Sequence, residues 1–205
     1  RIVNAPGGST TSVVLVPEPV FDEVRIRGEV PAGLRAAPVS GAWSIEGVAS
    51  GTYVVLAAFE NDDLVRDPDA SIGGTGIVRL TVGGDGTLVT APEAFNVTAA
   101  LGIVSPGADG TDTVPLGDPT FRWVDDSSED GYELRVYDAL GGLVHEDLDV
   151  PRAMGSGDVT YTWSGATLTP GMIYQFRVFS WRDATGGRTY ISASEDLRGT
   201  FLIAP

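Results

Sequence analysis

Carboxylates dominate the side chains of this sequence that could do chemistry. The 205 residues include 28 acidic and 13 basic side chains, a single histidine and no cysteine, which gives a formal charge of −15. Every basic residue is an arginine, because the sequence contains no lysine. Calcium binds where several oxygen ligands gather on one flexible loop. Acidic loops are therefore the first place where this chain could hold a ligand.

Two loops carry enough carboxylates for such a site. The first lies at residues 61–69 and offers the candidate calcium ligands Asp62, Asp63, Asp67 and Asp69. The second, residues 125–131, offers four carboxylates and begins like an EF-hand loop, but its twelfth position is Tyr137 where that loop has a glutamate. A solvated acidic turn is the alternative interpretation of both loops. Calcium is the one cofactor that the sequence indicates.

The sequence lacks the residues that most types of catalytic site require. A nucleophilic triad would depend on His145, the only histidine, which we expect on a strand, and a histidine-rich zinc site cannot form. Without lysine, Schiff-base chemistry and a phosphate-binding P-loop are excluded. Pairs of carboxylates occur by chance in so acidic a chain, and no spacing singles one out. We therefore expect no catalytic activity.

The charge also bears on partners and location. A chain with a charge of −15 and no basic stripe repels a phosphate backbone, so nucleic acid is excluded as a partner. No apolar run reaches the ~18 residues that a membrane span needs. The sequence begins at Arg1, which suggests that a signal segment has been removed. We expect an extracellular or cell-surface location in a bacterium.

The elements that would position any site are short strands. Glycine and proline are abundant, with 27 and 13 residues, and apolar residues alternate over short runs with no long helical spacing. The length suits two domains of about 100 residues, each with its own core. The sequence therefore predicts an all-β fold of two tandem β-sandwiches.

Residues 1–19 form an N-terminal segment with one strand at 12–16. Its apolar residues are Val13, Val14, Leu15 and Val16. We expect this strand in the first domain. Because it lies close to the start of the sequence, the alternative is a donor strand that completes the sheet of a neighbouring subunit.

The first domain is predicted at residues 20–101. Its strand candidates are 24–30, 42–45, 52–59, 76–82 and 95–101, and the run at 53–59 is apolar on both faces, as in a central strand. The stretch from Gly47 to Val55, with Gly51-Thr52-Tyr53-Val54, resembles the core-strand signature of transthyretin-like domains of the carboxypeptidase regulatory type. That resemblance implies a small β-sandwich that stiffens or spaces secreted proteins without catalysis of its own.

The second domain is predicted at residues 102–205, after a boundary of turn-forming composition at 102–118. Its strand candidates are 121–123, 132–136, 141–146, 160–163, 174–181 and 199–203. Phe121-x-Trp123 and Leu168-x-Pro170-Gly171-x-x-Tyr174 resemble the core-tryptophan strand and the tyrosine-corner turn of fibronectin type III domains. The resemblance implies an immunoglobulin-like sandwich, and neither fold implies a function by itself.

Alternation along two of these strands predicts a contact surface. The strands are those predicted at 132–136 and 174–181. If Tyr174 and its alternate neighbours face the core, the outward residues at and next to these strands include Arg135, Tyr137, Arg177, Phe179 and Trp181. Arginine and aromatic residues are enriched in protein interfaces. The alternative is that the first domain or the loop at 182–189 covers this face.

These observations favour a non-catalytic structural or adhesive module, or a subunit of a surface filament, whose partner is a protein. A carbohydrate-binding accessory module of a secreted enzyme is the second hypothesis. In that case the rings of Trp181, Phe179 and Tyr137 would stack on sugars.

Overall fold

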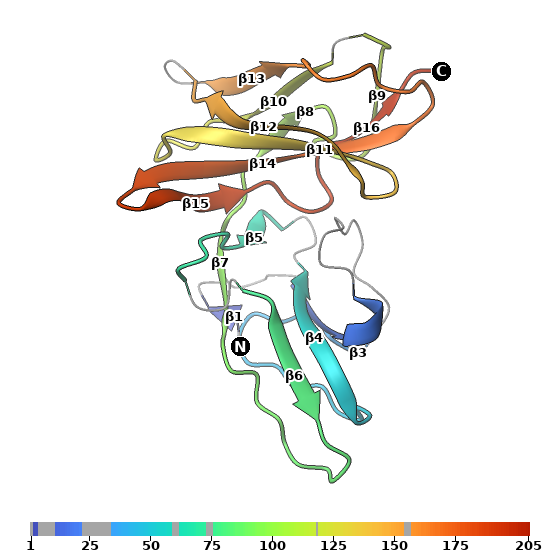
Figure 1. Ribbon diagram of the computed structural model, residues 1–205, viewed down its shortest axis with the longest axis vertical. Helices are drawn as coiled ribbons and strands as arrows, with labels where there is room; N and C mark the ends of the chain where they lie inside the picture. The colour runs from blue at the N-terminus through green and yellow to red at the C-terminus, as the bar shows by residue number, and fades with distance from the viewer. Residues whose placement is uncertain are drawn as a thin grey trace.

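The computed structural model describes residues 2–3, 11–21, 34–58, 62–72, 76–117, 119–153 and 157–205. The described residues form strands, loops and one short 3-10 turn (η1, Glu18–Val20), with no α-helix among them. The all-β prediction is confirmed. Figure 1 shows two β-rich parts along the long axis of the molecule, joined where the chain leaves β7 (Phe95–Ala99). We call the described residues up to Ala100 the first unit and residues 101–205 the second unit.

The first unit contains a four-stranded and a three-stranded sheet. The four-stranded sheet has the order β3-β2-β4-β6, and the three-stranded sheet has the order β1-β7-β5. Their strands besides β7 are β1 (Ile2–Val3), β2 (Ser12–Pro17), β3 (Leu34–Ala36), β4 (Gly51–Ala58), β5 (Leu64–Arg66) and β6 (Val78–Val82). Side chains from both sheets, among them Val13, Val55 and Phe95, pack into one apolar core.

The predicted central strand and the predicted N-terminal strand are both interior strands of the four-stranded sheet. β4 pairs with β2 on one side and with β6 on the other, and Tyr53, Val54 and Val55 are buried on its two faces, as the apolar run predicted. β2 in turn lies between β3 and β4. Donation of its residues Val13, Val14, Leu15 and Val16 to a neighbour would therefore require an interior strand to leave its own sheet.

Two strand predictions in this unit had other outcomes. The segment 42–45 forms no strand, so that prediction is wrong. Its alternation is nevertheless real, because Trp43 and Ile45 pack against the core without a neighbouring strand to pair with. The strand predicted at 24–30 lies outside the described residues.

The second unit contains a three-stranded and a six-stranded sheet. The first has the order β13-β10-β8, and the second has the order β12-β11-β14-β16-β9, with β15 also paired to β14. Their strands are β8 (Ile103–Ser105), β9 (Asp112–Val114), β10 (Thr120–Val124), β11 (Gly131–Asp138), β12 (Leu143–Pro151), β13 (Asp158–Thr162), β14 (Ile173–Ala184), β15 (Gly187–Ala193) and β16 (Thr200–Ile203). β8 and β9 lie inside the segment that the sequence indicated as a boundary.

Both sheets of the second unit contribute to a single aromatic core. Phe121 and Trp123 of β10 are fully buried on the same face, as predicted, and the ring centroid of Phe121 lies 4.7 Å from that of Phe176 on β14. Tyr174 and Val178 belong to the same core, so the predicted alternation along β14 is confirmed.

The turn before β14 is fixed by the tyrosine that follows it. Gly171 adopts a φ of 75°, a conformation that favours glycine, directly after Pro170. The backbone N–H of Thr169 donates a hydrogen bond to the Tyr174 hydroxyl at 2.9 Å. This contact anchors the loop to the core, and it sets which residues of β14 face inward.

Candidate functional site

The outward positions of β11 and β14 form one continuous face. The register places Glu133 beside Phe179 and Arg135 beside Arg177, while Tyr137 pairs with Gln175 and Gly131 with Trp181. Directly opposed residues of antiparallel strands project on the same side of the sheet. The structure therefore brings all five predicted residues together. We call Arg135, Tyr137, Arg177, Phe179 and Trp181, with their neighbours Glu133, Arg188 and Tyr190, the contact face.

Trp181 is buried in this face, contrary to the expectation that it is exposed. Its side chain is only 6% exposed. The ring lies over Gly131, where a Cβ atom would stand 2.5 Å from Cζ2 of the indole. The guanidinium of Arg188 covers the ring at 3.7 Å from its centroid. Arg188 belongs to the segment 182–189, which was the alternative cover for this face.

Arg177 is buried as well, at 8% exposed. Its guanidinium donates hydrogen bonds to the hydroxyl and the carbonyl of Ser194, at 3.2 and 2.5 Å, and pairs with Asp196 at 2.5 Å. These acceptors belong to the segment between β15 and β16, which returns across the face. The expectation that Arg177 is open to a partner is therefore wrong, because its donors are satisfied within the chain.

Phe179 lies between two guanidinium groups at the centre of the contact face. Its ring centroid is 5.3 Å from Cζ of Arg135 and 5.8 Å from Cζ of Arg177, distances at which cation–π attraction operates. Tyr190 approaches the same ring edge-on. Phe179, Arg135 and Tyr137 keep part of their surface in solvent, so the open part of the face is small.

A buried carboxylate organises this stack. Glu133 accepts a hydrogen bond from the Tyr190 hydroxyl and forms an ion pair with Arg135. Burial, reinforced by the nearby Glu133 carboxylate, raises the pKa of Tyr190 to about 12. The phenol therefore stays protonated at neutral pH and remains a donor. The alternation along the two strands predicted the face and placed Glu133 among its outward positions, but it gave no signal for Arg188 or Tyr190.

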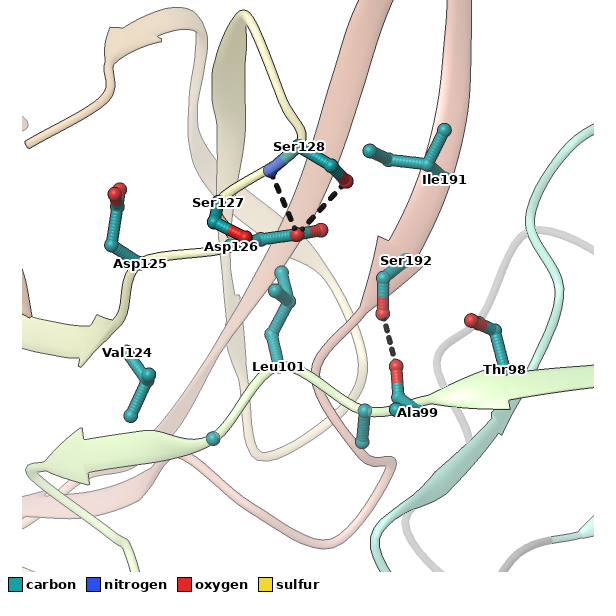
Figure 2. A pocket seen from close by; sticks show the side chains of 12 residues that line it. Thr98, Ala99, Leu101, Val124, Asp125, Asp126, Ser127, Ser128, Ile191 and Ser192 are labelled. Carbon is teal, nitrogen blue, oxygen red and sulfur yellow. Dashed lines mark hydrogen bonds between the residues drawn. The ribbon is translucent and has the colours of Figure 1, made fainter.

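A cleft of about 380 Å³ separates the two units beside their connection. Its walls come from the connecting segment 98–102, the loop 124–128, and Ile191 with Ser192 of β15. Figure 2 shows Asp126 and Ser128 on one side and the Ser192 hydroxyl directed at the carbonyl of Ala99 on the other. Two carboxylates, Asp125 and Asp126, line it, and Asp126 accepts hydrogen bonds from Ser128 and from the Ser180 hydroxyl.

The connection between the units is itself hydrogen bonded. Leu101 forms a parallel bridge with Ser194, its N–H donates to the carbonyl of Ala193 at 2.9 Å, and the Ser192 hydroxyl donates to the carbonyl of Ala99 at 2.5 Å. The buried carboxylate of Glu195 accepts the backbone N–H of Asp63 at 2.9 Å and a hydrogen bond from Arg198 at 3.2 Å. Burial raises the pKa of Glu195 despite these donors.

The predicted calcium ligands of the first loop do not converge. Asp62 and Asp63 precede β5, whereas Asp67 and Asp69 follow it. Asp67 accepts hydrogen bonds from the N–H of Asp69 and from Asn96, and Asp69 accepts from Ser71. Across the described part of the chain, no three histidine, cysteine, aspartate or glutamate side chains are placed to hold a metal ion. The prediction assumed one continuous loop, and β5 divides it.

The carboxylates of the second loop have structural contacts. Asp125 accepts hydrogen bonds from the Tyr132 hydroxyl at 3.0 Å and from the N–H of Ala153 at 3.2 Å. Asp130 accepts the N–H of Asp183 at 2.9 Å. Glu129 is buried, and the pKa of its carboxyl is raised by burial and by the nearby charges of Asp125 and Asp126. This loop therefore closes one end of the second unit.

His145 is a partly exposed residue of β12, as expected, but it has specific partners. Its Nε2 lies 2.9 Å from the Tyr161 hydroxyl, which in turn lies 2.8 Å from the hydroxyl of Ser164. The imidazole also packs on Trp163, with the ring centroids 4.7 Å apart. These contacts of His145 join β12, at the edge of one sheet, to β13 at the edge of the other.

Comparisons with known proteins gave no match to a family model, to a curated protein or to a solved structure. In the described residues there is also no helix with the length and apolar character to cross a membrane.

Proposed function

We propose that this chain is a non-catalytic structural or adhesive module of an extracellular or surface-attached bacterial protein, with a protein as its partner. It consists of a transthyretin-like and a fibronectin type III-like β-sandwich in tandem. Its role is to hold two protein surfaces at a fixed distance and angle. The observation that carries the proposal is the hydrogen bonding between the units, in which the Ser192 hydroxyl donates to the carbonyl of Ala99.

Rigidity follows from the way this connection is built. β7 ends at Ala99 and β8 begins at Ile103, so the joining segment is too short to act as a flexible tether. The bond from Asp63 to the buried Glu195 adds a second attachment between the units. A buried, charge-assisted hydrogen bond resists the opening that independent motion of two domains would require.

The fold of the second unit supports the fibronectin-like assignment. Its aromatic strand β10, the hydroxyl contact from Tyr174 to the preceding turn and the pairing of β11 with β14 all agree with the features that suggested the resemblance. Such a domain offers faces and loops for binding without a catalytic site of its own.

The carbohydrate-binding hypothesis has less support. Sugar rings stack on aromatic faces that are open to solvent, and the indole of Trp181 lies between Gly131 and Arg188. Only Phe179 and Tyr137 keep part of their rings accessible. A protein partner suits this small mixed surface better.

The proposal is tested by residual dipolar couplings measured separately for the two units. A rigid spacer requires one common alignment tensor in the wild-type protein. Glu195→Ala should give two different tensors and lower the stability by about 2 kcal/mol, since it removes two hydrogen bonds to a charged acceptor. Glu46→Ala, at an exposed position of the first unit, is the control and should change neither. Two tensors in the wild-type protein would refute the proposal.

A further inference from the structure

Strand β12 is an open edge of the six-stranded sheet. It ends the order β12-β11-β14-β16-β9, and among the described residues it pairs with β11 alone. It spans nine residues, Leu143–Pro151. An edge strand presents a row of backbone donors and acceptors that can pair with another strand. In Figure 1, β14 and β15 lie between β12 and the first unit.

Three apolar residues of this edge are about half exposed. Leu143 is 49% exposed, Val144 is 41% exposed and Leu148 is 48% exposed. Single exposed apolar residues are common on protein surfaces. Several on one edge strand indicate a surface that can bind another chain. They provide apolar area to an added strand, while the free backbone provides hydrogen bonds.

The charges of the same strand select the kind of occupant. Glu146, Asp147 and Asp149 make β12 strongly acidic. Antiparallel pairing of two copies centred on Glu146 would place this carboxylate opposite its own copy, and like charges directly opposed destabilise a sheet. Each copy also carries a charge of −15. Another copy of this chain is therefore a poor occupant, and a cationic strand is a favourable one.

Side chains contact both halves of this edge. In the first half, the imidazole of His145 contacts Tyr161 and Trp163. The guanidinium of Arg188 donates to the carbonyl of Leu148 and pairs with Asp149 at 2.7 Å, so the second half is already in contact with β15. Val144 lies at a register shift, where Leu143 pairs with Tyr137 and His145 with Val136. Val144 itself has no Cα partner on β11.

We propose that the β12 edge binds an extended segment of another protein in which basic and apolar residues alternate. The segment adds as a further strand beside Leu143, Val144 and Glu146. This proposal deepens the adhesive role and rests on it for its biological context. The two tests are independent, because the edge binds or fails to bind whether or not the two units move as one body.

The probe is a labelled synthetic peptide of alternating lysine and valine, about as long as β12, titrated by fluorescence anisotropy at low ionic strength. We expect saturable binding that protects the amides of β12 from hydrogen exchange and leaves those of β6 unchanged. The control peptide has the same sequence with alternate amides N-methylated, which keeps the charge and blocks the strand pairing. Equal binding of both peptides, or protection elsewhere than β12, would overturn the proposal.

Matched variants separate the edge from the general charge of the chain. Glu146→Gln and Glu46→Gln both change the net charge from −15 to −14. Only Glu146→Gln should lower the affinity for the peptide. The expected loss is about two- to five-fold, because an exposed ion pair contributes little. Val144→Pro removes a backbone donor and should weaken binding on the order of ten-fold. If Glu46→Gln weakens binding equally, the proposal fails. Self-association that Val144→Pro abolishes would assign the edge to a second copy and also overturn it.

Discussion

The packing of Trp181 on Gly131 gives the sharpest quantitative prediction about the contact face. A Cβ atom at position 131 would lie 2.5 Å from Cζ2 and 3.0 Å from Cε2 of the indole. Ordinary carbon–carbon contacts are about 3.5–4.0 Å, so the Gly131→Ala methyl group requires a shift of about 1 Å. The guanidinium of Arg188 also lies 3.7 Å from the ring centroid, which leaves the indole little room to move.

The expected cost follows from this overlap. Inserting a methyl group into a well-packed site destabilises by about 1–3 kcal/mol. Gly131 has no positive φ, so the substitution adds no backbone strain to the steric overlap. We expect Gly131→Ala to lower the free energy of unfolding by about 2 kcal/mol and Tm by roughly 4–8 °C.

Thermal and urea unfolding measure this loss. The control is Gly157→Ala, because a Cβ at position 157 meets no atom within 4 Å and its φ is not positive. We expect the stability of that variant to equal or slightly exceed that of the wild type.

A double-mutant cycle tests the physical cause. In a Trp181→Leu background the indole is gone, and the loss caused by Gly131→Ala should fall to a few tenths of a kcal/mol. An unchanged stability of Gly131→Ala in the wild-type background would refute the packing described here. A loss that persists in the Trp181→Leu background would show that the cause is something other than the ring.

Two further predictions concern buried polar groups. Glu129→Gln should raise Tm at pH 7 and have no effect below about pH 4. Burial raises the folded-state pKa of Glu129, so the wild-type residue contributes its full stability only while protonated and loses it as the pH rises. A Tm difference that shrinks as the pH rises from 4 to 7 would contradict this sign. Tyr161→Phe removes the contacts to His145 and Ser164 and should cost about 1 kcal/mol in urea unfolding. An unchanged midpoint would indicate that water replaces the hydroxyl.

The sequence predicted the interior of the fold well because alternation reports burial. The strands around Val54, Phe121 and Tyr174 were correctly located, and the inward and outward sides of β14 were assigned from its period of two. The alternation of apolar residues around Trp43 led to a wrong strand prediction, because this segment packs on the core without pairing to another strand. The short strands β5 and β8 were missed, since three residues carry too little pattern.

The candidate sites were less predictable because they depend on segments distant in sequence. Nothing near Trp181 indicates that Arg188 folds back over its ring, or that Gly131 lies beneath it. The four aspartates at 62–69 are close in sequence, yet the intervening strand separates them. Proximity along a chain predicts a metal site only when the backbone between the ligands is free to curl.

The sequence alone determined the all-β class, the buried side of the main strands and the gathering of Arg135, Tyr137, Arg177, Phe179 and Trp181 on one face. These features depend on local alternation, which the chain carries in every strand. The tertiary structure decided how much of that face is open, how Glu195 ties the two units together and that β12 pairs on one side alone among the described residues. Such features arise from contacts between residues far apart in the sequence, where no local pattern records the partner.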